Sequence, residues 1–175
     1  CWPAHEAQPG LADKARPTVD LGAARTALAL AECAHVLGAR MDPLVGRRIR
    51  WEVDQRCLTP YLTRHDHRWL YTTPTYTVNN WTGVCHGGVI GAAVYLEQDT
   101  ARLAELLARA LRALDDYLES FDSQGGASEG PSIWAFGFSH YTILADLVER
   151  RTGGRVSMWE QPVVRETAQF PLRTL

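Results

Sequence analysis

The chain has 175 residues, which is the length of one domain and enough to bury a hydrophobic core. Its 46% hydrophobic and 22% charged residues are typical of globular proteins and exclude a disordered or collagen-like chain. A formal net charge of -2 gives no reason to expect nucleic acid as a partner, and the longest apolar run, residues 89–96, is far shorter than the ~20 residues of a membrane span.

The first half of the sequence predicts two helices and a long loop. Asp20 is the expected N-cap of an Ala-rich helix that runs to Leu37. An Asp-Pro pair at positions 42 and 43 starts a second helix, which Pro60 kinks or ends. Residues 61–80 are rich in aromatic residues, Thr and His, and we expect them to form a long ordered loop.

The second half predicts three long helices. The first covers residues 82–96, and its internal glycines, among them Gly87, Gly88 and Gly91, indicate close packing against a neighbour. Asp99 or Thr100 caps the next helix, whose apolar residues recur at spacings of three and four. A glycine-rich loop then leads to a helix over residues 132–151, which Gly153 ends.

These elements define the expected fold class. No β-strand alternation is found, so we predict an all-α fold of consecutive antiparallel helical hairpins. We expect a single domain over residues 1–175, with an irregular lead-in at 1–19 and an irregular tail at 154–175 that contains a short helix after Glu160.

The basic residues and the cysteines carry limited chemical information. Arg makes up 17 of the 18 basic residues, and its planar guanidinium suits bidentate binding of carboxylate or sulfate; genomic base composition is the alternative explanation. The four cysteines lie far apart without paired spacing, so we expect buried free thiols and neither a zinc site nor a disulfide framework. They are Cys1, Cys33, Cys57 and Cys85.

A polar and aromatic stretch opens the predicted helix at 82–96. Asn79, Asn80 and Trp81 place amide donors beside an aromatic platform at the helix entry. The alternative is structural, with Asn79 as the helix cap and Trp81 in the core.

The glycine-rich loop carries one carboxylate, Glu129, next to the aromatic start of a helix at Trp134. Glu129 is either a functional carboxylate or a capping group near the positive end of a helix. Further along, His140 and Tyr141 are neighbours of the kind that acid–base chemistry uses. Tyr141 also lies on the inward stripe of its helix, where a Tyr is usually a core residue with a satisfied hydroxyl.

Two other groupings give weaker signals. His65, Asp66 and His67 suggest a metal site only weakly, because two alternating His residues in a loop fall short of a ligand set. Cys85 and His86 do not form a nucleophile–base pair, since adjacent helical side chains point about 100° apart. No phosphate loop, dinucleotide fingerprint or HExxH motif is present, and we expect no metal and no cofactor.

The motifs together resemble the heparinase II/III-like proteins. The similarity is to the α/α-toroid part of those polysaccharide lyases, and it spans most of the chain. It is carried by Asn79-Asn80-Trp81, Cys85 and Gly87-Gly88, paired with Glu129-Gly130-Pro131, Trp134 and Tyr141. The resemblance implies part of an (α/α) toroid that acts on uronate-containing acidic polysaccharide by β-elimination. In that reaction amide or imidazole donors neutralise the substrate carboxylate, and a Tyr helped by a His moves the protons.

Carried onto this chain, the resemblance assigns catalytic roles to three residues. Asn80 matches the carboxylate-binding Asn, and Tyr141 is the candidate acid–base. His86 is the candidate substitute for a His that many members carry where this chain has Trp81. The implied substrate-binding residues are Asn79, Trp81, Glu129, Trp134 and His140.

The family also sets expectations about size and partners. Its members are several times longer, so we expect a fragment of a longer chain, with open toroid edges that favour self-association. The implied partner is an acidic polysaccharide or oligosaccharide, with neither nucleic acid nor a membrane span. The family suggests the periplasm or secretion, although no signal segment opens the sequence.

The alternative function is a non-catalytic helical module. Such a module either binds carbohydrate through its aromatic side chains or has a purely structural role. The aromatic candidates are Trp69, Tyr71, Tyr76, Trp81 and Trp134.

Overall fold

The computed structural model describes residues 15–70 and 78–173, and within these ranges the protein contains helices and no strand. The all-α class predicted from the sequence is therefore confirmed. Most of the predicted lead-in lies outside the described residues, as does the middle of the predicted loop at 61–80.

The first helices begin at the residues that the sequence indicates. Helix α1 (Leu21–Leu37) follows Asp20, whose carboxylate accepts a hydrogen bond of 2.7 Å from the backbone N–H of Ala23. Helix α2 (Pro43–Val53) follows Asp42, which accepts in the same way from Leu44 at 2.7 Å. Each cap satisfies an N–H group that has no partner within its helix, so both helix starts are set locally.

The helical run passes through Pro60, with a change of geometry before it. A π-helical turn, η3 (Asp54–Leu58), joins α2 to α3 (Thr59–Thr63), and a 3₁₀ turn, η4 (Arg68–Leu70), follows. Pro60 has no N–H and its ring crowds the carbonyl four residues earlier, so a wider turn just before it relieves that crowding. The predicted loop at 61–80 was therefore too long at its start, since α3 ends only at Thr63.

Four further helices complete the described chain. They are α4 (Asn80–Leu96), α5 (Thr100–Glu119), α6 (Pro131–Thr152) and α7 (Pro162–Arg173). Helix α4 begins two residues before the predicted start, because the Asn79 side chain accepts from the Trp81 N–H at 3.0 Å. Of the two predicted cap residues, Asp99 caps α5 and Thr100 is the first residue of that helix. Gly153, with a φ of 61°, ends α6 as the sequence predicts.

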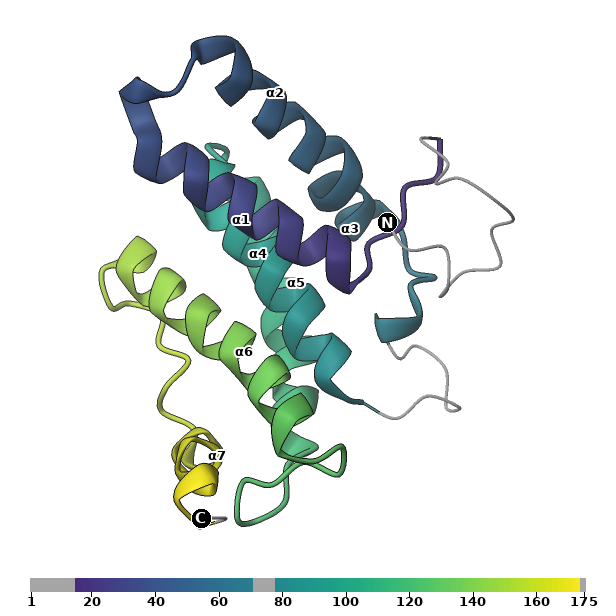
Figure 1. Cartoon of the computed structure of the whole chain (residues 1–175), viewed down its shortest axis with the longest axis vertical. Coiled ribbons are helices and arrows are strands. Elements are labelled where there is room, and N and C mark those ends of the chain that lie inside the picture. Colours follow the sequence, from purple (N-terminus) through teal and green to yellow (C-terminus); the bar gives the residue numbers. More distant parts are fainter. Residues whose placement is uncertain (1–14, 71–77, 174–175) are drawn as a thin grey trace.

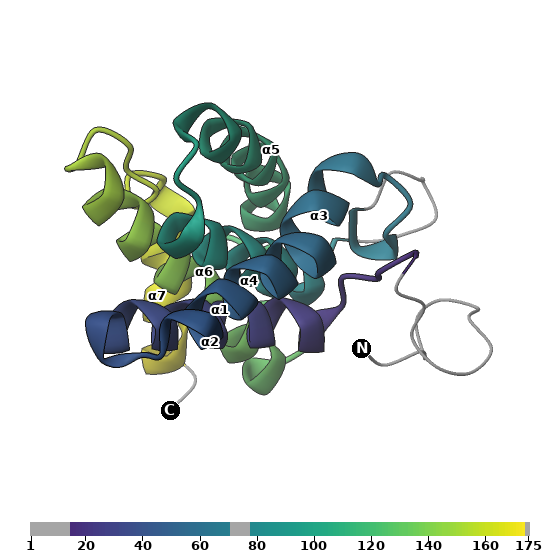
Figure 2. The same cartoon turned by 90° about the horizontal axis from the view of Figure 1, so that it is seen from above.

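Helix α4 is the central helix, and it lies between α1 and α6 (Figures 1 and 2). Gly88 of α4 faces Ala24 of α1, and Gly91 faces Leu28, so these two helices run in the same direction. The contacts between α4 and α6 also advance in the same direction along both helices, so α6 runs in the same direction as α4. Helix α5 returns in the opposite direction, since Tyr117 near its end packs on the start of α4. This alternation matches the predicted helical hairpins.

The glycines of α4 allow its neighbours to approach closely. A Cβ atom on Gly87 would lie 2.7 Å from the carbonyl oxygen of His140 in α6. One on Gly88 would lie 2.6 Å from the carbonyl oxygen of Ala24 in α1. Both distances are too short for any side chain, which confirms the tight packing predicted from the glycine content. Every residue from Thr82 to Ala93 is buried, so α4 forms the centre of the core.

The cysteine prediction is correct for Cys57 and Cys85, which are buried free thiols, and wrong for Cys33, which is exposed. The buried face of α1 follows Ala24, Ala27, Leu28 and Ala31, and Cys33 lies off that face. Cys1 lies outside the described residues.

Candidate functional site

The two motifs singled out in the sequence meet where α4 begins and the loop before α6 ends. The backbone N–H of Asn80 donates to Glu129 Oε2 at 3.0 Å, and the Asn80 amide Nδ2 donates to Glu129 Oε1 and Oε2, both at 2.9 Å. Asn80 is buried, whereas Glu129 is exposed. The carboxylate therefore also sits at the positive end of α4, which is the capping role considered for it above.

The space between these groups is small. Asn79, Asn80, Glu129 and Trp134 line a pocket of about 20 Å³, which is room for roughly one water molecule. The Asn79 oxygen caps α4, and Trp81 and Trp134 are partly buried against the core. The structural alternatives for Asn79 and Trp81 thus describe their observed contacts.

Tyr141 lies in the core and does not line this pocket. Its side chain is 1% exposed, and its hydroxyl donates to the carbonyl oxygen of Met158 at 2.5 Å. Its ring stacks on Phe138 at a centroid distance of 5.8 Å. Burial raises the pKa of the phenol well above its ordinary value, so a phenolate at this position is strongly disfavoured.

His86 and His140 are likewise held by internal contacts. His86 is fully buried, and its Nδ1 lies 2.6 Å from the Tyr61 hydroxyl, with the ring edge-on to Trp69. Burial lowers the pKa of His86 to about 3, and the nearby Arg109 guanidinium adds to this effect. His140 donates from Nδ1 to the carbonyl oxygen of Phe136 at 2.8 Å, and burial lowers its pKa. Neither imidazole lines the pocket beside Asn80 and Glu129.

The three residues of the weak metal signal contact different partners, and His65 Nδ1 lies 3.4 Å from a terminal nitrogen of Arg109. Asp66 pairs with Arg64 at 2.8 Å and with Arg16, and these guanidinium groups hold the pKa of the carboxyl well below its ordinary value. His67 is buried and stacks on Trp69 at 5.3 Å. Within residues 15–70 and 78–173, no three His, Cys, Asp or Glu side chains form a group suited to a metal ion.

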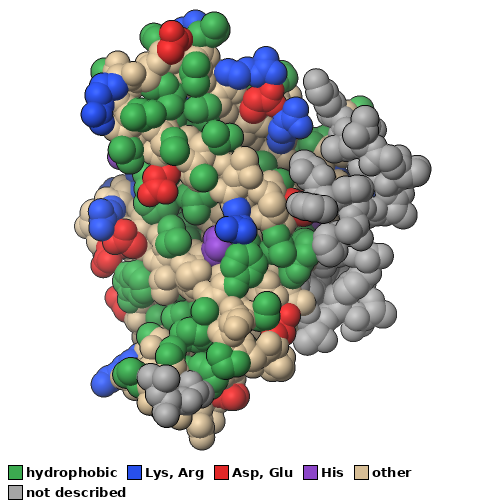
Figure 3. All heavy atoms as spheres, in the orientation of Figure 1, with side chains coloured by type: hydrophobic (Ala, Val, Ile, Leu, Met, Phe, Trp, Pro, Cys, Tyr) green, Lys and Arg blue, Asp and Glu red, His purple; other side chains and the backbone are tan. Residues whose placement is uncertain are grey.

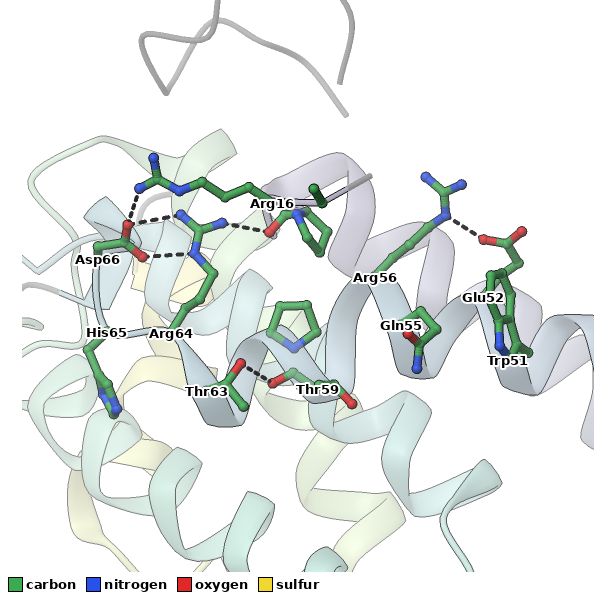
Figure 4. A pocket seen from close by; sticks show the side chains of 13 residues that line it. Arg16, Trp51, Glu52, Gln55, Arg56, Thr59, Thr63, Arg64, His65 and Asp66 are labelled. Atoms are coloured by element: carbon green, nitrogen blue, oxygen red, sulfur yellow. Dashed lines mark hydrogen bonds and ion pairs between the residues drawn. The ribbon is translucent and has the colours of Figure 1, made fainter. Parts of the chain in front are cut away.

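A much larger hollow lies elsewhere, along α2, η3 and α3 beside residues 15–17. This groove has a volume of about 630 Å³ and is open to solvent (Figure 4). It contains Trp51, whose side chain is 54% exposed. We refer to it below as the Trp51 groove.

Sequence reasoning missed Trp51 and chose aromatic residues that are less accessible. Trp69 is 3% exposed, and Trp81 and Trp134 are partly buried, while Tyr71 and Tyr76 lie outside the described residues. One signal was available, because Trp51 lies off the apolar stripe of α2 and follows Arg47, Arg48 and Arg50.

Comparison with known sequences adds no assignment. No protein-family model matches the chain, and no curated protein is significantly similar to it. Among the described helices, none combines the length and apolar character needed to cross a membrane.

Proposed function

We propose that this chain is a helical module that binds an acidic glycan without cleaving it. The main support is the state of the groups that β-elimination would use. The Tyr141 phenol and the His86 imidazole are both buried and engaged in internal contacts, and neither faces Asn80.

Exposing Tyr141 to a substrate would be energetically costly. Its hydroxyl would have to leave the Met158 carbonyl, and an unsatisfied buried acceptor costs about 1–3 kcal/mol. Its ring would also lose the stacking contact with Phe138. A group that must break this packing is poorly placed to act as a general acid or base, since catalysis needs a positioned side chain.

The exposed side chains of the surface are better placed to bind a glycan than the buried side chains of the core are to catalyse its cleavage. The Trp51 groove combines an exposed indole with guanidinium and amide side chains, the groups that contact sugar rings and their carboxylates. The family resemblance described above contributes the acidic glycan as the expected ligand class.

One titration separates binding from cleavage. The chain is mixed with heparin, chondroitin and alginate in turn, and binding is followed by calorimetry while ultraviolet absorbance reports any new sugar double bond. We expect saturable binding to at least one polymer and no rise in absorbance. A rise in absorbance would establish elimination instead, and no binding to any of the three would favour a purely structural module.

The open edge of the α1–α2 hairpin supports a second part of this proposal, namely self-association. Four large apolar side chains flank the η2 turn (Gly38–Arg40) and are 41–67% exposed: Val36, Leu37, Leu44 and Val45. Hydrophobic side chains also reach the surface at this end in Figure 3. We propose that a second copy of the chain covers them.

A further inference from the structure

The side chains that line the Trp51 groove are of the kinds that form a ligand-binding subsite. Trp51, Gln55, Thr59 and Thr63 follow one another at intervals of four residues along α2, η3 and α3, and all four line the groove (Figure 4). The interval of four keeps side chains on one side of a helical run. The groove is thus lined by an aromatic ring at one end and by amide and hydroxyl groups beyond it.

Arg56 supplies a cation beside this row. Its Nε donates to Glu52 Oε2 at 2.5 Å, which fixes the side chain. Figure 4 shows the two terminal nitrogens at the outer end of the guanidinium, and no hydrogen-bond partner for them is found among the described residues. They can therefore donate a pair of parallel hydrogen bonds to a carboxylate.

The charges around the groove favour an anionic ligand. Its lining includes three Arg residues and two carboxylates, Glu52 and Asp66. Both carboxylates are already paired, Glu52 with Arg48 and Arg56, and Asp66 with Arg16 and Arg64. The lining thus keeps a positive balance, and that balance attracts an anion.

The surroundings of Trp51 argue against an apolar protein partner. The Arg48 guanidinium carbon lies 5.0 Å from the indole centroid, so a cation already covers part of the ring. Arg47 and Arg50 are exposed on the same helix. An apolar partner over Trp51 would have to desolvate these charges, which costs several kcal/mol unless they are paired. A polar ring compound avoids that cost.

We propose that the Trp51 groove binds a short oligosaccharide that contains a uronate, with one sugar ring against the Trp51 indole and the uronate carboxylate on the terminal nitrogens of Arg56. Gln55 lies between them in sequence and contacts ring hydroxyls. Residues five apart in a helix are separated by about 7.5 Å along its axis, which is the scale of a short oligosaccharide. This assignment rests on the proposed function and adds the site and the role of each side chain.

The test uses a glucuronate-containing oligosaccharide and its carboxyl-reduced, neutral counterpart. Affinity for both is measured by calorimetry for the unsubstituted chain and for Trp51→Ala and Arg56→Gln. The controls are Trp159→Ala and Arg151→Gln, which remove an exposed Trp and an exposed Arg that do not line the groove. Circular dichroism confirms that each variant is folded.

We expect Trp51→Ala to weaken binding of both ligands about tenfold, because it removes the stacking surface. Arg56→Gln should weaken binding of the acidic ligand about tenfold and abolish the preference over the neutral one. The controls should stay within about twofold.

Each failure has a different meaning. If the unsubstituted chain binds the acidic oligosaccharide and both groove variants bind it equally well, the glycan site is elsewhere and the groove assignment is wrong. If Arg56→Gln weakens both ligands equally, Arg56 does not recognise the carboxylate. If the unsubstituted chain binds neither ligand, the proposed function itself fails.

Discussion

Replacing Gly88 by Ala tests whether the close contact between α1 and α4 determines the stability of the fold. The added Cβ would lie 2.6 Å from the Ala24 carbonyl oxygen and 3.0 Å from the Ala24 Cβ, whereas ordinary contacts begin at 3.4 Å. The nearest atom belongs to the backbone, so the two helices must move apart by roughly 0.8 Å. Because α1 and α6 both pack on α4, a shift on one side also disturbs the other.

The expected loss of stability follows from two opposing effects. Overpacking costs about 1–3 kcal/mol, while the better helix propensity of Ala returns about 1 kcal/mol. We therefore expect Gly88→Ala to lower the free energy of unfolding by up to about 2 kcal/mol, or the Tm by up to about 4–8 °C for a domain of this size.

A matched control is available in α2. A Cβ on Gly46 would lie 3.7 Å from the Met41 sulfur, which is ordinary contact, so Gly46→Ala should be neutral or stabilise by about 0.5–1 kcal/mol. Urea unfolding followed by far-ultraviolet circular dichroism measures both variants. A Gly88→Ala protein as stable as the Gly46→Ala protein would refute the packing argument.

Three further outcomes follow from the same structure. Tyr141→Phe should lower the free energy of unfolding by about 1–3 kcal/mol, because the Met158 carbonyl loses its buried donor, and should leave glycan affinity unchanged in calorimetry; a large loss of affinity would return Tyr141 to the binding site. The folded-state pKa of His86, about 3, lies below its ordinary 6.5, so the unfolded chain takes up the proton first. His86 should therefore have no effect on stability above pH 6.5 and should reduce it as the pH falls towards 3, by about 1.4 kcal/mol per pH unit. The free energy of unfolding of His86→Gln, measured across that pH range, should lack this pH dependence. An equal slope of the free energy against pH in both proteins would contradict the prediction. Finally, Val36→Glu with Leu44→Glu should abolish a concentration-dependent dimer in light scattering, and a monomeric unsubstituted chain at every concentration would refute self-association.

The helix starts were predictable because they depend on neighbouring residues. The Asp20, Asp42 and Asp99 caps each bond a backbone N–H two or three residues further on, so the sequence contains both partners of each contact. The π turn before Pro60 gave no such signal. Asp54, in that turn, is held by Arg102 of α5 at 2.5 Å, a contact between residues 48 positions apart. Local patterns do not report contacts of this kind.

For the candidate site, sequence reasoning singled out residues that lie close together, and it missed how accessible the side chains are. Asn80 and Glu129 were singled out separately as substrate-contacting residues, and in the structure they contact each other. Tyr141 was given two interpretations, as an acid–base group and as a core residue on the inward stripe of α6. Its burial agrees with the second. Trp51 was overlooked because exposure depends on how helices are rotated in the packed structure, which periodicity gives only for the apolar face.

The contact between Asn80 and Glu129 also bears on where a ligand can bind. The amide that the family resemblance assigns to a substrate carboxylate already holds a carboxylate of the same chain, with three donor–acceptor distances of 2.9–3.0 Å. A uronate at this position would have to displace Glu129, which is tethered nearby and therefore competes at a high effective concentration. The Arg56 guanidinium is also held by a carboxylate of its own chain, Glu52, but only through Nε, and no partner for its terminal nitrogens is found among the described residues. An acidic ligand thus gains more new hydrogen bonds in the Trp51 groove than at the start of α4, and this difference is the physical reason to look for binding on the outer surface of α2 and α3.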